Sequence, residues 1–439
     1  MLLRFSTSNH GPFRDTAELS LVSGAASGTT APEDDWTAAT TRVAGIYGAN
    51  ASGKSSVLDA MKLFRSAVRF SATRWGERKH FPFRPFRLDR RTIESPSSYE
   101  VDFVASGTRY NYGFESDSDG IREEWLLSYP FKRPRTLFHR SGPSDEPTFQ
   151  FSRHLRGPNS TIAKLVRGNS LYLSTAANNN HPVLTPLARD LVESFVHAEF
   201  DESDRLSRLN WTKNAIENPD ILREAEVLLA MADTGITGLE LSRSDMDGEL
   251  RSKIERLFEI LHDDRPATDH PEGVQAIVDD LQREIRFKHR STDPETTTLG
   301  INEESSGTVS WLTIGLPALQ CIKHGKTLVV DELDASLHPM LSTTLIEMFK
   351  NSEINSTGAQ LVFTSHDTSF LGKSTVGALE RDEVWFTEKN GAGNAELYSL
   401  YEFRARGDDN FERRYLQGRY GAVPLIDLEH VRTLMGTAR

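Results

Sequence analysis

A glycine-rich octapeptide is the segment of this sequence with the clearest chemical meaning. A short apolar run at 43–47 precedes it, and apolar residues at helical spacing follow it, which places a turn between a strand and a helix. Glycines let backbone N–H groups curl around phosphate oxygens, and a helix N-terminus adds positive potential. The octapeptide therefore predicts a loop that binds nucleotide phosphates, with the sequence Gly48, Ala49, Asn50, Ala51, Ser52, Gly53, Lys54 and Ser55.

Two side chains of this loop have separate expected roles. Lys54 would reach the β- and γ-phosphate oxygens, and the Ser55 hydroxyl would be a ligand of Mg²⁺. We therefore expect ATP and Mg²⁺ to bind together. The predicted nucleotide contacts in this segment are Gly48, Asn50, Ala51, Ser52, Gly53, Lys54, Ser55 and Ser56.

Two adjacent carboxylates follow an apolar strand much later in the chain. The run at 327–330 ends at Asp331 and Glu332, and ligands of parallel α/β sheets bind at the carboxyl ends of strands. We expect Asp331 to hold Mg²⁺, directly or through water. Glu332 would accept a proton from the attacking water, which requires a carboxylate within hydrogen-bond reach of that water.

A histidine occupies the same kind of position after another apolar strand. The run at 360–363 is followed by a short polar segment that contains His366. A lone histidine is usually structural, but the repeated placement at a strand end favours a functional role. We expect His366 to hydrogen-bond the γ-phosphate.

The remaining chain shows two patterns of apolar and polar residues. Residues 98–140 alternate between apolar and polar positions with intervening turns, which predicts an antiparallel meander. Residues 186–290 show apolar residues at helical spacing, namely Leu187, Leu191, Phe195, Ile254, Leu257, Phe258, Leu261, Ile277, Leu281 and Ile285. We therefore expect four segments, which are 1–185 with the phosphate loop and the meander, a helical insertion at 186–290, a second half of the nucleotide domain at 291–400, and a tail at 401–439.

Composition limits the function classes. The chain has 439 residues and a formal net charge of −12, so its surface as a whole would repel a phosphate backbone and any nucleic-acid contact must be local. No apolar run approaches the roughly 18 residues of a membrane span. The start of the chain lacks the pattern of a signal peptide, and the single cysteine, Cys321, fits a reducing compartment. We expect a cytoplasmic protein without a membrane segment.

One stretch, residues 74–91, combines cations with aromatic residues. The favoured interpretation is a solvated loop whose aromatic side chains enter the core, and a nucleic-acid or protein contact is the alternative. Since the nucleotide chemistry does not require this stretch, we expect charge reversal at Arg84, Arg87 and Arg90 to leave ATP hydrolysis intact.

The order of these motifs resembles the ABC ATPases of the SMC, RecF and OLD branch, and most closely the stand-alone RloA-like ATPases of bacterial anti-phage operons. Residues 304–308 resemble the family signature, which implies that Ser305, Ser306 and Gly307 contact the γ-phosphate bound by a second copy. Residues 337–339 resemble a dimer-interface segment, and residues 415–424 resemble the end of RloA-like proteins. Asn9 falls near the nucleotide edge of the family's first strand.

The resemblance implies a fold and a function. The fold would be an α/β ABC ATPase head, with a phosphate-loop sheet, an antiparallel β subdomain and a helical insertion. The protein would dimerise on ATP and control a separately encoded effector such as a nuclease in phage defence. The alternative is a DNA repair or chromosome-maintenance ATPase of the RecF or SMC type that clamps DNA. Residues 74–91 occupy the region of the family's glutamine loop, which would place them near the nucleotide or near a partner.

Overall fold

The computed structural model describes residues 1–24, 35–243, 281–290, 298–372, 378–404 and 410–424, apart from a few single positions, together with several positions between 248 and 278. The chain divides into two compact units. The first unit comprises Met1–His197, Gln320–Asp334 and Ser342–Arg439. The second unit comprises Ala198–Leu319 and Ala335–Leu341.

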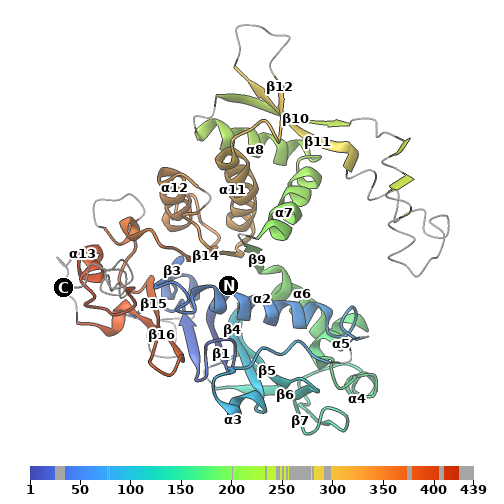
Figure 1. Cartoon of the computed structure of the whole chain (residues 1–439). Coiled ribbons are helices and arrows are strands. Elements are labelled where there is room, and N and C mark those ends of the chain that lie inside the picture. The colour runs from blue at the N-terminus through green and yellow to red at the C-terminus, as the bar shows by residue number, and fades with distance from the viewer. Residues whose placement is uncertain are drawn as a thin grey trace. The chain divides into compact units, whose positions relative to one another are not determined.

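A six-stranded sheet forms one part of the first unit (Figure 1). Its order is β16-β15-β3-β14-β13-β9, and β13, β14, β3 and β15 are parallel. All residues of β3, β13 and β14 are buried, which is typical of parallel strands covered on both faces. The strands span Val43–Gly48 (β3), Phe195–Ala198 (β9), Thr327–Val330 (β13), Gln360–Thr364 (β14), Val384–Lys389 (β15) and Ala395–Ser399 (β16).

A seven-stranded antiparallel sheet forms the rest of the first unit. Its order is β2-β1-β4-β5-β6-β7-β8, so the expected meander is confirmed and extends to a first strand and to β8. The strands span Leu2–Ser8 (β1), Ala17–Ser20 (β2), Ser97–Ala105 (β4), Thr108–Asp117 (β5), Gly120–Tyr129 (β6), Arg135–Ser141 (β7) and Thr148–Phe151 (β8).

Helix α2, Lys54–Phe70, packs onto this sheet and carries the phosphate loop at its N-terminus (Figure 1). Its buried stripe includes Phe64, whose ring stacks on Phe114 and meets Phe5 edge-on. Buried Gln360 joins the two sheets, because its amide donates to the carbonyl of Leu2 and accepts from the backbone N–H of Leu2. The core therefore fixes the start of α2 relative to β14.

Several shorter elements complete the first unit. Phe386 of β15 stacks on Tyr415 and Tyr420, so the expected tail packs onto the six-stranded sheet as far as residue 424. The elements span Trp36–Ala39 (α1), Arg90–Ile93 (α3), Asn159–Ala163 (α4), Tyr172–Asn178 (α5), Leu184–Glu193 (α6), Pro339–Lys350 (α12), Thr368–Leu371 (η4), Leu400–Glu402 (η5) and Phe411–Leu416 (α13).

The second unit combines helices with a small sheet, although a purely helical insertion was expected. Phe195 belongs to β9 and Ile285 to a strand in which Ile285 and Phe287, two residues apart, are both buried. The helices are Glu202–Ala215 (α7), Pro219–Met231 (α8) and Ser306–His324 (α11), and the sheet β10-β11-β12 consists of Ile236–Arg243, Arg283–His289 and Thr298–Gly300. The helical pattern expected at Ile254, Leu257, Phe258, Leu261 and Ile277 lies outside the described residues.

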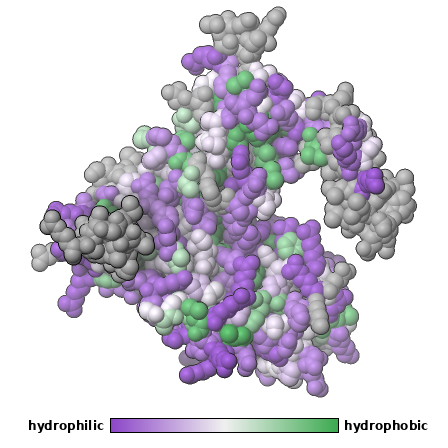
Figure 2. Space-filling model, in the orientation of Figure 1, coloured by the Kyte–Doolittle hydropathy of each residue, from purple (hydrophilic) through white to green (hydrophobic). Residues whose placement is uncertain are grey.

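The visible surface is largely hydrophilic, and apolar residues form small separate groups on it (Figure 2). Within the described residues, no helix combines the length and apolar character that crossing a membrane requires.

Candidate functional site

The phosphate loop is a tight turn between β3 and α2. A Cβ atom at Gly48 would lie 2.4 Å from the carbonyl oxygen of Thr387, so only glycine fits there. Gly53 adopts φ 118° as the N-cap of α2, a conformation that glycine adopts without steric cost. The loop closes over Lys54, whose Nζ donates to the carbonyl oxygens of Gly48 at 2.9 Å and Ala49 at 3.2 Å.

Lys54 lies in an electrostatic setting suited to phosphate. Its side chain is buried, and this desolvation lowers its pKa, while the carboxylates of Asp331 and Glu332 act in the opposite direction. A phosphate oxygen in the loop would be an anionic partner for this ammonium group, in addition to the two carbonyls.

Asp331 and Ser55 meet at the carboxyl ends of β13 and β3. Asp331 Oδ1 accepts hydrogen bonds from Ser55 Oγ at 3.0 Å and from Thr364 Oγ1 at 2.5 Å. Mg²⁺ is commonly held by one or two protein oxygens together with phosphate oxygens and water. The hydroxyl of Ser55 and the carboxylate of Asp331 fit this requirement, and they would hold the ion.

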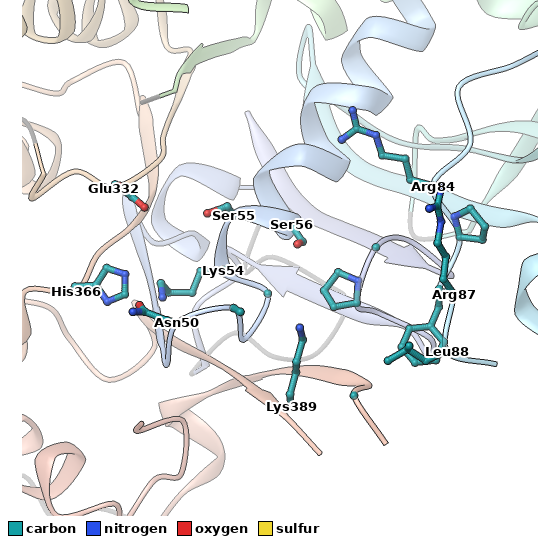
Figure 3. Close-up of a pocket in the computed structure, with 17 residues that line it drawn as sticks. Asn50, Lys54, Ser55, Ser56, Arg84, Arg87, Leu88, Glu332, His366 and Lys389 are labelled. Carbon is teal, nitrogen blue, oxygen red and sulfur yellow. The ribbon is translucent and has the colours of Figure 1, made fainter. Parts of the chain in front are cut away.

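Glu332 and His366 flank the same strand ends. Glu332 has φ 48°, an uncommon conformation for a residue with a side chain, and its backbone N–H donates to Thr364 Oγ1 at 2.8 Å. The backbone N–H of His366 donates to Asp334 Oδ1 at 3.1 Å. Figure 3 shows Glu332, His366 and Asn50 around Lys54 on one side of a cavity.

This cavity has a volume of about 940 Å³ and extends from the phosphate loop to residues 84–88. Arg84, Arg87 and Leu88 lie on the side opposite Glu332 and His366 (Figure 3). This volume lies within the range usual for pockets that bind small molecules and cofactors, and it is large enough for ATP. The lining residues are Gly11, Pro12, Asn50, Ala51, Gly53, Lys54, Ser55, Ser56, Arg84, Pro85, Phe86, Arg87, Leu88, Glu332, His366, Lys389 and Gly393.

Comparison with protein families agrees with this geometry. The family described as "AAA domain, putative AbiEii toxin, Type IV TA system" matches residues 43–372, which include the phosphate loop, both carboxylates and His366. The chain belongs to this family. Its fold is accordingly that of a P-loop ATPase, and the expected α/β class with parallel and antiparallel sheets is confirmed.

Two further comparisons concern single proteins. No curated protein matches this AbiEii-type AAA chain. Among solved structures, the "Crystal structure of the SmcHead bound to the C-winged helix domain of ScpA" is similar, with 12% sequence identity and a TM-score of 0.40. The similarity covers 91% of this chain and 97% of that chain.

In this AbiEii-type AAA chain, residues 74–91 contribute some side chains to the core and others to the cavity wall. Phe81 and Phe86 are buried, as the favoured interpretation of residues 74–91 expected. Arg84 and Arg87 line the cavity, and Arg84 also donates to both carboxylate oxygens of Asp59. These two arginines therefore lie near the phosphate loop, one of the two locations that the resemblance implied, because the segment returns along the N-terminus of α2. The expectation that their charge reversal leaves ATP hydrolysis intact stays a prediction.

Asn9 supports the cavity wall from outside. Its Nδ2 donates to the carbonyl oxygens of Thr92 at 2.7 Å and Ser95 at 2.8 Å, and its Oδ1 accepts from the N–H of Phe86 at 2.9 Å. The side chain is buried and does not line the cavity, whereas the neighbouring Gly11 and Pro12 do. Asn9 thus orders the segment that carries Arg84 and Arg87.

The predicted signature residues belong to the second unit. Ser305, Ser306 and Gly307 lie at the start of α11, where Ser305 Oγ accepts from the N–H of Thr308 at 3.0 Å. Ser306 and Gly307 line a separate cavity of about 640 Å³, together with Arg205 of α7. The structure therefore places the phosphate loop, Asp331, Glu332 and His366 in one unit and the signature in the other.

Thr364 and Lys389 are polar residues of the site that were not predicted from the sequence. Thr364 accepts from the Glu332 N–H and donates to Asp331, so it joins the ends of β13 and β14. Lys389, at the end of β15, lines the cavity. The position of Thr364 directly before the polar segment that contains His366 was the available signal for it.

Proposed function

We propose that this chain binds ATP with Mg²⁺ and hydrolyses the β–γ phosphoanhydride bond. One observation carries this function, which is the convergence of Lys54, the Ser55–Asp331 pair and Glu332 in one cavity. The parallel strands β3 and β13 deliver these groups at their carboxyl ends, where α/β sheets bind ligands, and β14 between them ends at Thr364.

In this mechanism each side chain has one task. Lys54 and the loop amides hold the β- and γ-phosphates, and Ser55 and Asp331 would hold Mg²⁺, which would neutralise charge on the phosphate oxygens. Glu332 takes a proton from the attacking water as the water oxygen bonds to the γ-phosphorus. His366 donates to a γ-phosphate oxygen. Thr364 fixes the positions of Asp331 and Glu332 through one hydrogen bond to each residue.

We further propose that two copies close around ATP. Ser305, Ser306 and Gly307 of one copy would contact the γ-phosphate held by the other, as the resemblance to ABC heads implies. The closed dimer would then control a separately encoded effector, such as a nuclease, in phage defence. The chemistry identified in the described residues serves one nucleotide, which is consistent with a switch that acts through a partner.

Phosphate release tests the enzymatic part. The wild-type protein with Mg²⁺ and ATP should release phosphate, and Glu332→Gln should bind ATP but turn over more slowly by orders of magnitude. Lys54→Ala should lose about 10- to 100-fold in ATP affinity by calorimetry, because a charge-assisted contact is removed. Lys62→Ala, a change of another cation on α2, is the control. Unchanged affinity in Lys54→Ala would overturn the assignment of the loop.

Expression in cells tests whether the protein acts only through a separately encoded effector. The gene should be neither toxic nor protective alone, and phage protection should appear only with a neighbouring gene. Full protection or toxicity from this gene alone would contradict the proposed effector, and would agree with the putative toxin that the family description names.

A further inference from the structure

The turn between β6 and β7 presents an aromatic side chain to solvent on a restrained loop. Residues 130–135 of this turn include prolines at both ends of the tip, Pro130 and Pro134. Phe131 is 81% exposed, whereas most phenylalanines of the sheet are buried in the core. Because proline restricts the backbone, ordering this tip against a ligand would cost less conformational entropy than ordering a flexible loop.

Cations of two neighbouring segments lie at the base of this tip. Arg133 belongs to the turn and Arg135 begins β7, and the chain that leaves β8 runs beside the start of β7, because the N–H of Ser152 donates to the carbonyl of Leu137 at 2.9 Å. That segment carries exposed Arg153 and His154. Partial desolvation and then the nearby charges of Arg135 and Arg153 lower the pKa of exposed His154, which agrees with this clustering.

These cations differ from the other arginines of the same sheet. Arg109 pairs with Asp102 at 2.9 Å, and Arg122 pairs with Asp117 and Asp119. In the part of the chain that the structure describes, Arg133, Arg135 and Arg153 make no ion pair with a carboxylate. A local cluster of uncompensated cations in a chain of net charge −12 indicates an anionic ligand.

We propose that this hairpin surface, formed by Phe131, Arg133, Arg135 and Arg153, binds single-stranded nucleic acid. The guanidinium groups contact phosphates, and Phe131 stacks on an unpaired base in or beside the hollow of about 510 Å³ that Pro130, Phe131, Arg133, Pro134 and Arg135 line. This binding site goes beyond the proposed ATPase switch and does not rest on it.

The chemistry favours a nucleic acid over an anionic membrane. A phosphate chain with exposed bases presents both negative charge and flat apolar faces, which are the partners that cations beside an exposed aromatic ring require. Membrane attachment requires a larger apolar face or a second anchor in addition to a basic patch. At the tip of the hairpin, Phe131 is the large exposed hydrophobic side chain, flanked only by two small prolines among the described residues.

The test is fluorescence anisotropy of the full chain, without nucleotide, against fluorescein-labelled 20-nucleotide single-stranded DNA and RNA over a range of NaCl concentrations. Arg133→Glu/Arg153→Glu should weaken binding at least tenfold and reduce the slope of log affinity against log salt by about 0.7 for each lost phosphate contact. Arg413→Glu/Arg419→Glu, the same charge change at α13 and the turn after it, is the matched control and should retain wild-type binding.

The contribution of the aromatic ring is measured separately. Phe131→Ala should weaken binding about tenfold with the salt slope unchanged, and Phe131→Trp should retain binding because its ring also stacks. Thermal melts compare folding of all variants, and Arg133→Gln/Arg153→Gln repeats the test without reversed charge. Equal binding by the hairpin and control variants would overturn the proposal. Binding of vesicles of phosphatidylcholine and phosphatidylglycerol by a wild-type protein that binds neither oligonucleotide would also overturn it.

Discussion

At the scale of single residues, Thr364 links the two carboxylates of the ATPase site. Its hydroxyl accepts from the Glu332 N–H at 2.8 Å and donates to Asp331 Oδ1 at 2.5 Å, so one side chain fixes both the metal ligand and the proposed base. Glu332 needs such support, because its backbone has φ 48°.

We predict that Thr364→Val lowers the turnover of ATP about 10- to 100-fold, the range found when groups that orient metal ligands are removed. ATP affinity should change much less than turnover, because Lys54 and the phosphate loop remain in place. Thr364→Ser, which keeps the hydroxyl, is the matched control and should stay near wild type. A steady-state phosphate assay gives both quantities. Equal losses in the serine and valine variants would mean that packing, not the hydroxyl, matters at this position.

At the scale of elements, strand ends were the most predictable feature. The runs at 43–47, 327–330 and 360–363 are short and continuously apolar, and each became a buried strand beside the others. Ile285 was misassigned to a helix because Leu281 and Ile285 fit helical spacing, although Ile285 and Phe287 also fit the two-residue period of a strand. The place of Arg84 and Arg87 on the cavity wall depends on the path of a loop, which local spacing does not encode.

Asn9 positions the loop that carries Arg84 and Arg87 through its side-chain hydrogen bonds. We therefore predict that Asn9→Ala lowers the free energy of unfolding by about 2 to 4 kcal/mol. The variant leaves the buried N–H of Phe86 without its acceptor, removes the donor to the carbonyls of Thr92 and Ser95, and puts alanine at φ 51°. ATP affinity should fall as well, since Arg84 and Arg87 lose their support. Asn179→Ala, which removes one side-chain hydrogen bond at the end of α5, should cost less in urea unfolding. Similar losses in both variants would contradict a supporting role specific to Asn9.

Strand β9 contains a histidine with buried ring nitrogens that makes stability depend on pH. In the part of the chain that the structure describes, neither ring nitrogen of His197 has a hydrogen-bond partner, and burial together with Arg65 and Lys62 lowers its pKa to about 3. The unfolded chain, with an ordinary pKa near 6.5, takes up a proton that the folded chain does not, so stability falls as pH drops below about 6.5.

We predict that His197→Phe reduces the loss of unfolding free energy between pH 7 and pH 5 by about 1 to 2 kcal/mol. Urea unfolding at the two pH values measures this difference. The same pH dependence in wild type and variant would show that His197 is protonated in the folded protein.

At the scale of the whole molecule, the proposed switch needs two copies, because the signature and the phosphate loop would act on one nucleotide from different chains. Gly307→Asp should abolish turnover without unfolding the protein, since a Cβ atom at Gly307 would meet only Ser305 Oγ at 3.9 Å. Mixing this variant with Lys54→Ala should restore at most one working site per mixed dimer. Complete inactivity of the mixture would place the signature elsewhere.

The mass of the Glu332→Gln protein in solution tests the central claim most directly. This variant should hold ATP without hydrolysing it, so the closed state should accumulate. Light scattering after size exclusion should give the mass of a dimer with Mg²⁺ and ATP and that of a monomer, 49.2 kDa, without nucleotide, and Lys54→Ala should stay monomeric in both. A Glu332→Gln protein that remains monomeric when saturated with ATP would contradict a site completed by two copies.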